Sequence, residues 1–404
     1  MTQEMEQLRQ HILTKLDLTR ETGDEELEEL IYNAVGDYSR KQGLSLLQRE
    51  QFQKEIYHSL RKLDALQELA DDPEVTEIMV NGAEHIFYEK DGRVRKWDRQ
   101  FYSKEKLEDV IQQIAAAGNK IINEANPIVD TRLKDGSRVN IVLSPIAIDG
   151  SAITIRKFPE QPMRMNQLIQ LGAVSSEAVD FLKQLVRAGY NIFVSGGTGA
   201  GKTTFLNALS EYIPSEERLI TIEDSAELQI QSVPNLIRLE TRTANMEGVK
   251  EISIRDLIRT SLRMRPNRII VGECRGAEAL DMLQAMNTGH DGSISTGHAN
   301  SSQDMLKRLE TMVLMGMDLP VAAIRSQIAS GIDILIHLGR LRDCSRKVLN
   351  IDEIDGMEDG EIKLHTIYRF VETKQAEQEG KVSGIWEKAG ELQNKEKLRE
   401  AGLC

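Results

Sequence analysis

The chain has 404 residues, enough for two or three domains with their own cores and too many for a single small binding module. Its 64 acidic and 51 basic residues give a net charge of −13, which argues against broad adhesion to nucleic acid or to anionic lipid. No stretch holds the roughly 18 to 20 apolar residues that span a bilayer, and the first residues form no secretory signal. We therefore expect a cytoplasmic protein without membrane insertion and without a specific nucleic-acid partner.

The N-terminal part predicts helices followed by a small mixed domain. Residues 1–70 carry apolar positions three or four apart, such as Phe52 and Ile56, and we expect a bundle of two or three helices. Residues 71–157 change to short β-branched and aromatic runs with two Asp-Gly turns and one helical stretch at 104–118. This pattern predicts a compact α+β domain with hairpins at the Asp-Gly turns.

The C-terminal part predicts a second, larger domain. Residues 158–166, FPEQPMRMN, hold two prolines and little periodicity, and we interpret them as a linker. Strand and helix patterns alternate over 167–371, which is typical of a mostly parallel sheet with helices on its faces. Residues 372–404 are charged with few apolar anchors and predict a loosely structured tail. The expected fold class is therefore α/β, with a smaller α+β domain and a leading helical segment before it.

A phosphate-binding loop follows the first strand of the larger domain. In residues 191–204, NIFVSGGTGAGKTT, an apolar strand leads into the spacing G-x-x-x-x-G-K-T and then into an amphipathic helix. Such glycines let backbone amides turn toward a β-phosphate, and the helix N-terminus adds its positive end. Lys202 would meet the β and γ oxygens and Thr203 would bind Mg²⁺, so the sequence predicts binding of ATP and Mg²⁺. The predicted nucleotide-binding residues are Gly196, Gly197, Thr198, Gly199, Ala200, Gly201, Lys202, Thr203 and Thr204.

Carboxylates at the ends of two other strands are candidates for ATP hydrolysis. The run RLITIEDSAEL delivers Glu223 and Asp224 at its carboxyl edge, where ligands bind in open α/β sheets. The run RIIVGECRGAEALDML delivers Glu273, while Gly272 occupies the place where a Walker B strand usually ends in Asp. This departure leaves open how Mg²⁺ is held. Glu273 would act through water, with Glu223 as the base that activates the attacking water.

A histidine completes the set of candidate catalytic residues. The run SISTGHANSSQDML brings His298 to the end of another short strand, before Asn300 and a new helix. In a sheet that already carries a phosphate loop, a histidine at that place can reach a γ-phosphate. The predicted catalytic residues are therefore Lys202, Glu223, Glu273 and His298.

Taken in order, these motifs resemble the secretion and pilus-assembly ATPases of the type II/type IV superfamily. The resemblance is carried by the Walker A loop GGTGAGKTT, the acidic box TIEDSAEL, the atypical Walker B run RIIVGECRGAEALDML and the histidine box STGHANS. The phrases VTEIMVNG, RLKDGSRVN and IRDLIRTSLRMRPNRIIVGE look most like the tight-adherence (Flp) pilus ATPases of the CpaF type. The chain has three cysteines and no C-x-x-C pair, so it lacks the four-cysteine zinc insertion of many type II secretion relatives.

The resemblance implies a RecA-like P-loop ATPase domain and ring-shaped hexamers at the inner face of the cytoplasmic membrane. It also implies that ATP hydrolysis drives an integral inner-membrane platform of a pilus or secretion system, with nucleotide between the two domains and the linker as a hinge. By position, Lys202 and Thr203 would hold phosphate and Mg²⁺, and Glu223 would be the catalytic glutamate. Glu273 would be the Walker B glutamate near the metal, and His298 would lie near the γ-phosphate.

Arginines then become candidates for a finger, since a guanidinium brought in by domain or subunit closure can stabilise the transferred phosphoryl group. The sequence does not single one out. The leading candidates are Arg132, Arg138 and Arg156 in the α+β domain, and the others are Arg238, Arg242, Arg263 and Arg265 in the larger domain.

Two other functions stay open at this point. The first is a type IV secretion ATPase that energises export of DNA or effector proteins. The second is a scaffold that binds ATP and assembles but turns over little of it.

Overall fold

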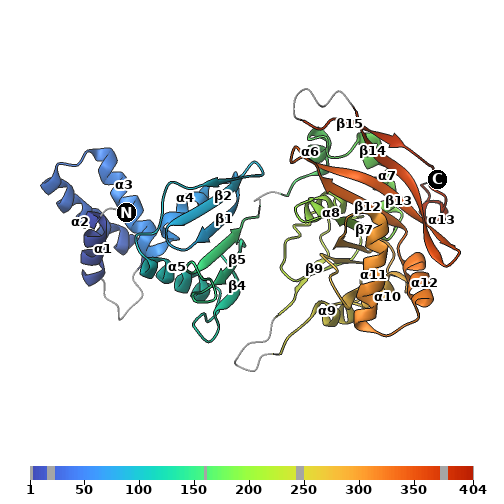
Figure 1. Ribbon diagram of the computed structural model, residues 1–404, viewed down its shortest axis with the longest axis horizontal. Helices are drawn as coiled ribbons and strands as arrows, with labels where there is room; N and C mark the ends of the chain where they lie inside the picture. Colours follow the sequence, from blue (N-terminus) through green and yellow to red (C-terminus); the bar gives the residue numbers. More distant parts are fainter. Residues whose placement is uncertain (1–2, 16–22, 159–161, 243–249, 374–380, 404) are drawn as a thin grey trace. The chain divides into compact units, whose positions relative to one another are not determined.

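The computed structural model forms two compact units, Met1–Glu160 and Gln161–Cys404 (Figure 1). It describes residues 3–15, 23–158, 162–242, 250–373 and 381–403. Parts of four predicted segments lie outside the described residues: 1–2 and 16–22 of the helical bundle, 159–161 of the linker, 243–249 of the larger domain, and 374–380 and 404 of the tail.

The first unit begins with a helical segment. Its elements are α1 (Gln3–Lys15), α2 (Asp24–Gln42), α3 (Leu46–Arg61), the 3-10 turn η1 (Asp64–Leu66) and α4 (Gln67–Asp71). Leu27, Ile31 and Ile56 are buried in a small core shared by these helices. Lys106 of the following domain donates a hydrogen bond to the Ser59 carbonyl oxygen at 2.8 Å. The helical segment and the α+β domain thus belong to one unit.

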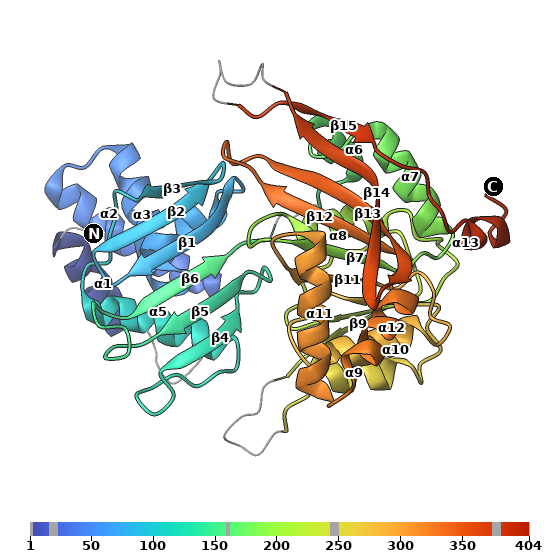
Figure 2. The same ribbon diagram turned by 45° about the vertical axis from the view of Figure 1, so that its right-hand side comes forward.

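A six-stranded antiparallel sheet follows, in the order β3-β2-β1-β6-β5-β4, and helix α5 (Lys104–Ala117) covers one of its faces (Figure 2). The strands are β1 (Val75–Asn81), β2 (His85–Lys90), β3 (Arg93–Lys96), β4 (Ile128–Arg132), β5 (Arg138–Val142) and β6 (Ala152–Arg156). Ile78 and Ile155 of the sheet pack with Ile111 of α5 in the core. The predicted strands, the predicted helix and both Asp-Gly hairpins are confirmed in this unit.

The second unit is built on a nine-stranded sheet in the order β15-β14-β13-β12-β7-β11-β10-β8-β9. Six neighbouring strands run parallel: β12 (Ile334–Arg340), β7 (Ile192–Gly196), β11 (Ile294–His298), β10 (Arg268–Val271), β8 (Leu219–Glu223) and β9 (Leu236–Glu240). Neighbouring residues of β7 point to opposite faces of the sheet. Val194 packs in the hydrophobic core on one face, and Phe193 packs in the core on the other face. Burial on both faces explains why β7, β8 and β10 are almost continuously apolar.

Helices cover both faces of this sheet, as the α/β prediction requires (Figure 1). On the face of Val194 lie α6 (Met165–Gln170), α7 (Ser176–Arg187) and α8 (Lys202–Ser210). On the face of Phe193 lie α9 (Ile254–Ser261), α10 (Glu278–Met286), α11 (Ser302–Gly316) and α12 (Val321–Gly331). Helix α6 begins inside the segment predicted as a linker, because Met165 is buried in the core.

The C-terminal end of the chain differs from the prediction. Beyond β12 the sheet continues antiparallel through β13 (Arg346–Glu358), β14 (Glu361–Glu372) and β15 (Gly384–Lys388), and α13 (Glu396–Glu400) follows. Trp386 donates a hydrogen bond to the Val348 carbonyl oxygen at 2.8 Å, and Lys397 lies 2.8 Å from Asp333. The prediction of a loosely structured tail is therefore wrong for residues 381–403, because contacts such as those of Trp386 and Lys397 hold this segment against the second unit.

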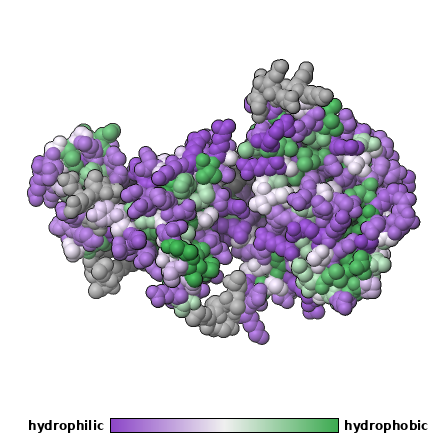
Figure 3. Space-filling view, viewed as in Figure 1, coloured by the Kyte–Doolittle hydropathy of each residue, from purple (hydrophilic) through white to green (hydrophobic). Residues whose placement is uncertain are grey.

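The visible surface of both units is mainly hydrophilic, with small apolar patches on each (Figure 3). Within the described ranges, no single helix is long and apolar enough to cross a membrane. Helices α11 and α12 reach the required length and apolar composition only when they are taken together, and the chain bends by 118° between them.

Candidate active site

The strand order brings the predicted catalytic residues to one edge of the sheet. Strand β11 lies between β7, which leads into the phosphate loop, and β10, which precedes Glu273. In the parallel register His298 is paired with Gly196, the first glycine of the loop. His298 consequently stands between the lysine of the loop and the carboxylate of the next strand.

The phosphate loop has the geometry that its glycines predict. Gly201 has a φ of 91°, in the left-handed region, and immediately precedes α8. Gly196 has no room for a side chain, because a Cβ there would lie 2.5 Å from the Leu338 carbonyl oxygen. Thr203 and Thr204 follow Lys202 in the first turn of α8, where they are half-buried. The N-terminus of this helix provides amides and positive potential for a phosphate.

Lys202 is held in a network that contains two other predicted residues. Its amine donates to the carbonyl oxygens of Gly196 and Gly197 at 3.3 and 3.2 Å, and to Nδ1 of His298 at 3.2 Å. Nε2 of His298 lies 2.8 Å from Oε1 of Glu273, a close contact without the alignment of a hydrogen bond. The loop lysine, the histidine and the Glu273 carboxylate are therefore neighbours.

Burial, together with the nearby cations, favours a neutral His298 ring. Burial lowers the pKa of His298, the Glu273 carboxylate opposes this, and the nearby cations Lys202, Arg275 and Arg308 lower it further. A protonated amine at Nδ1 requires that nitrogen to accept, so the proton of a neutral ring sits on Nε2, toward Glu273. Burial also lowers the pKa of Lys202, with Glu273 as the group that opposes the shift.

Glu223 has a different environment, although its strand β8 is the next neighbour of β10. Its side chain is buried, and Oε1 accepts hydrogen bonds from the amides of Glu227 and Leu228, both at 2.9 Å. Oε2 is buried and accepts no hydrogen bond from the described residues. Burial raises the pKa of Glu223 to about 7, although both amides and Arg238 act in the opposite direction. A carboxylate with this pKa can exchange a proton near neutral pH.

The glycine at the usual Walker B position now has a physical explanation. Gly272 forms a backbone hydrogen bond with β8, its amide donating to the Ile222 carbonyl oxygen at 2.8 Å. A Cβ on Gly272 would lie 2.9 Å from Cγ of Glu223. The space that an aspartate would fill is therefore taken by the glutamate of the neighbouring strand.

The site also offers oxygen atoms suited to Mg²⁺. Glu223 Oε2 and Glu273 Oε1 are both buried without a hydrogen-bond donor among the described residues. No cluster of three or more acidic, histidine or cysteine side chains that could hold a metal occurs in the described part of the chain. Mg²⁺ ordinarily uses one or two carboxylates with phosphate and water oxygens, so one carboxylate of this sheet edge together with the Thr203 hydroxyl is a set of donors that fits this ion.

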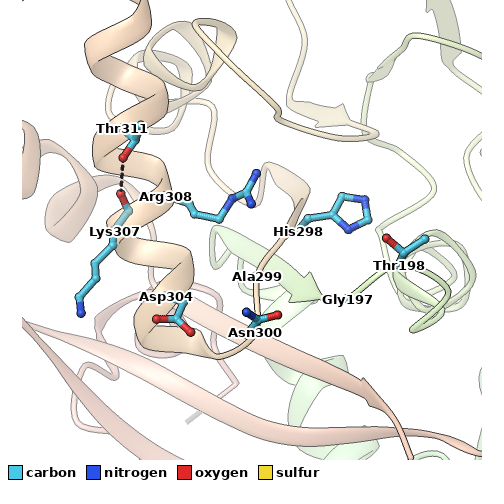
Figure 4. A pocket seen from close by; sticks show the side chains of 9 residues that line it. All are labelled: Gly197, Thr198, His298, Ala299, Asn300, Asp304, Lys307, Arg308 and Thr311. Carbon is cyan, nitrogen blue, oxygen red and sulfur yellow. Dashed lines mark hydrogen bonds between the residues drawn. The ribbon is translucent and has the colours of Figure 1, made fainter.

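A cavity of about 480 Å³ opens beside the loop (Figure 4). Figure 4 shows Arg308 reaching from α11 toward His298, whose ring points toward Thr198 of the loop. Cationic and polar side chains on the wall of this cavity suit a bound polyphosphate. The lining residues are Gly197, Thr198, His298, Ala299, Asn300, Asp304, Lys307, Arg308 and Thr311.

One residue of the network, Arg275, was not singled out from the sequence. Its guanidinium binds Oε2 of Glu273 through Nε at 2.8 Å and Nη2 at 2.6 Å, and Nη1 lies 3.6 Å from Asp224. The signal lay in the spacing: in an extended backbone, residues two apart point to the same side. Arg275 follows Glu273 by two, so it could have been named as a partner of that carboxylate.

The three leading candidate arginines lie in one row of the six-stranded sheet. Arg132 is paired with Arg138 across β4 and β5, and Arg138 is paired with Arg156 across β5 and β6. Directly paired residues point to the same face, and the buried Val139 and Ile155 point to the other face, toward α5. The strand register thus places on one face of the sheet three arginines that are separate in the sequence. The remaining candidates, Arg238, Arg242, Arg263 and Arg265, are exposed in the second unit.

Comparison with known families gives one clear match. A family model described as type II/IV secretion system protein matches residues 60–392. A putative conjugal transfer protein of Mycobacterium tuberculosis is 33% identical over 299 residues, which cover 72% of this chain and 84% of that protein. The type IV secretion system protein PtlH of Bordetella pertussis is 33% identical over 321 residues, which cover 73% of this chain and 95% of that protein. VirB11 of Brucella suis is 32% identical over 307 residues, covering 68% and 84%.

Solved structures show the same fold. The ATPase DotB of Legionella pneumophila is 22% identical, covering 74% of this chain and 81% of that chain, with a TM-score of 0.51. The pilus retraction motor PilT with bound ADP is 19% identical, covering 76% and 82%, also with a TM-score of 0.51.

Proposed function

This chain belongs to the type II/IV secretion system protein family, and we propose that ATP hydrolysis at the site around Lys202 and Glu223 powers its work in pilus assembly or secretion. ATPase activity and a motor role in secretion or pilus assembly come with the family. The narrower assignment, to tight-adherence pilus ATPases of the CpaF type, rests on the phrases VTEIMVNG, RLKDGSRVN and IRDLIRTSLRMRPNRIIVGE.

The observation that carries the proposal is the juxtaposition of two unlike groups at one sheet edge. One is the network of Lys202, His298 and Glu273 beside the phosphate loop. The other is the Glu223 carboxylate, buried with a raised pKa on the adjacent strand. Nucleotide binding needs the first group, and hydrolysis needs a proton acceptor such as the second.

In the proposed mechanism, the loop amides and Lys202 bind the β- and γ-phosphates of ATP. Glu223 accepts the proton of the attacking water at Oε2, the oxygen to which no described residue donates a hydrogen bond. Lys202 exchanges its contact with His298 for the phosphate, and the neutral His298 ring keeps a donor at Nε2 near the γ-phosphate. Charge on the transferred phosphoryl group is stabilised by Lys202 and by an arginine from the row Arg132, Arg138 and Arg156.

Thr203 and Glu273 would hold Mg²⁺, with Glu273 acting directly or through water. Bound Mg²⁺ would neutralise part of the charge of the phosphates. Arg275 fixes the orientation of Glu273 through two hydrogen-bonding nitrogens, which keeps Oε1 available toward His298 and the metal position.

The proposed assembly is a hexamer that works at the inner face of the cytoplasmic membrane. Nucleotide would lie between the two units, with the linker 158–166 as the hinge and the arginine row acting within a subunit or on its neighbour. Opening and closing of this gap would move an integral platform protein in the membrane. The division of the chain into two compact units at residues 160 and 161, inside the predicted linker, supports this part.

A specific observation favours a second candidate within the same family. PtlH and VirB11 carry the name type IV secretion system protein and match this chain at 33% and 32% identity. The alternative is therefore an ATPase that energises export of DNA or effector proteins. Neighbouring genes separate the two: pilin and prepilin peptidase genes support the pilus assignment, and coupling-protein genes support export.

The proposed motor is tested by phosphate release from the purified full chain, with and without membranes that contain its platform. We expect steady turnover of ATP that increases when the membranes are added. Tight ATP binding without phosphate release in both conditions would identify a nucleotide-gated scaffold and overturn the motor proposal.

A further inference from the structure

A hairpin from the far end of the domain lies against the phosphate loop. Strand β12 runs parallel to β7, with Leu338 paired with Gly196, and β13 returns antiparallel with Arg346 paired with Arg340. The hairpin tip, 341–345, therefore projects past the carboxyl end of β7, where the loop begins. None of the sequence motifs points to this hairpin as part of the nucleotide site.

Arg346 makes a direct contact with the loop. Its Nε donates a hydrogen bond to the Gly199 carbonyl oxygen at 2.8 Å. A Cβ built on Gly201 would lie 3.3 Å from Cδ of Arg346, and one built on Gly199 would lie 3.9 Å from Nη1 of Arg340. Two guanidinium groups from the hairpin thus flank the segment that turns into α8.

The orientation of the Gly199 carbonyl matters for phosphate binding. A loop of this kind holds phosphate through amides that point inward, while its carbonyl oxygens must point elsewhere. Gly199 has a φ of 70°, and glycine has little intrinsic preference that would keep its peptide in a single orientation. A hydrogen bond from a charged donor, with a net worth of roughly 1.5 to 3 kcal/mol, can fix that orientation.

The hairpin is itself anchored, so Arg346 comes from a defined position. Asp343 accepts hydrogen bonds from the amide and hydroxyl of Ser345 at 3.0 and 2.6 Å. It also accepts one from the amide of Val382 at 2.7 Å. Burial raises the pKa of Asp343, but these hydrogen bonds outweigh it and lower the pKa to about 2. The hairpin is therefore tied to the C-terminal segment that ends the sheet.

We propose that Arg346 is a positioning residue of the phosphate loop, which holds the Gly199 carbonyl away from the phosphate and places a permanent positive charge beside it. The proposal rests on the proposed binding of ATP by this loop. It extends the nucleotide site to the β12–β13 hairpin, and through Asp343 to residues beyond 381. Loss of Arg346 weakens nucleotide binding, while the fold, whose cores the side chain does not enter, is kept.

The test compares R346A with R342A in the full chain. Arg342 is an arginine of the same hairpin that pairs with Glu372 at 2.6 Å, and it serves as the matched control. The measurements are the Kd for MgADP and the unfolding temperature without nucleotide. We expect R346A to bind MgADP about tenfold more weakly, which corresponds to about 1.4 kcal/mol. R342A should bind like the wild type, both variants should keep the wild-type unfolding temperature, and R346K should recover part of the affinity.

The proposal would be overturned if R346A bound MgADP as tightly as the wild type. It would also be overturned if R346A and R342A lost the same amount of affinity. If R346A does not fold, R346Q carries the same expectation, because glutamine retains a stem against Gly201 and loses the cationic donor. Failure of the wild type to bind MgADP would contradict nucleotide binding at the loop itself, which is a separate result from a silent R346A.

Discussion

Glu223 and Glu273 end neighbouring parallel strands, and yet the two carboxylates have opposite surroundings. Glu273 is paired with Arg275 and lies within reach of His298, with Lys202 close by. Glu223 is 4% exposed, and only backbone amides donate to it in the described part of the chain. A carboxylate held by cations is placed to bind and orient, whereas burial without a paired cation favours the protonated form of Glu223. The difference suits Glu273 to the metal and Glu223 to the water.

The largest effect should come from removing the cation that the phosphate requires. K202A deletes the amine beside His298, so MgATP should bind at least 100-fold more weakly, and phosphate release should be abolished. Equilibrium binding and phosphate release measure the two effects. Turnover within tenfold of the wild type would place hydrolysis elsewhere in the chain.

A second change acts mainly on the Glu273 side of the comparison. R275A removes two donors from the Glu273 carboxylate, which then loses its fixed orientation. We expect kcat to fall about 30-fold, within the range for lost positioning partners of metal-binding groups. A requirement for higher Mg²⁺ concentrations should accompany it, and R275K should be intermediate. An unchanged Mg²⁺ dependence would separate Arg275 from the metal position.

The pH dependence of kcat tests whether Glu223 must lose its proton before ATP is hydrolysed. Because the pKa of Glu223 is raised to about 7, its basic form increases with pH through neutrality. Turnover should therefore rise about tenfold from pH 6 to pH 8 and then level off. The profile is measured with saturating MgATP on a pH-stable buffer series. A flat profile across this interval would remove Glu223 as the group that must lose its proton.

The smallest expected effect tests the contact between the two strand ends. In G272A the new Cβ would lie 2.9 Å from Glu223 Cγ, so the glutamate must shift. We expect kcat to fall about fivefold with little change in nucleotide affinity, because a small misplacement of a catalytic group is costly. Gly23 offers the control, since a Cβ added there meets no atom within 4 Å. Equal kcat in G272A and G23A would contradict the tight packing.

The local sequence pattern was sufficient to predict most helices and strands and the candidate residues at the ends of the strands. The alternation of strand and helix predicted a parallel sheet, and parallel strands bring their carboxyl ends to one edge. That is why Lys202, Glu273 and His298, which are far apart in the sequence, could be expected together. The roles assigned to them remain predictions that the experiments above address.

What the sequence did not reveal depends on contacts between distant segments. Residues 381–403 have few apolar positions, but Val382, Leu392 and Leu398 are buried and Lys397 finds Asp333 and Asp291. The partner of Gly199, Arg346, lies 147 residues away. Neither pairing can be recognised from periodicity in the sequence, because each depends on how the antiparallel strands at the C-terminal end pack in the folded domain. The row of Arg132, Arg138 and Arg156 likewise needed the register of three strands.

The most direct test of the central claim is a comparison of E223Q with E273Q in the full chain. Glutamine preserves the shape of either side chain and removes its capacity to take a proton or to bind a metal as an anion. E223Q should bind MgATP as tightly as the wild type and retain it intact, with phosphate release slower by about 100- to 10,000-fold. E273Q should instead bind MgATP more weakly. Phosphate release from E223Q at a rate near that of the wild type would contradict the assignment of Glu223 as the base.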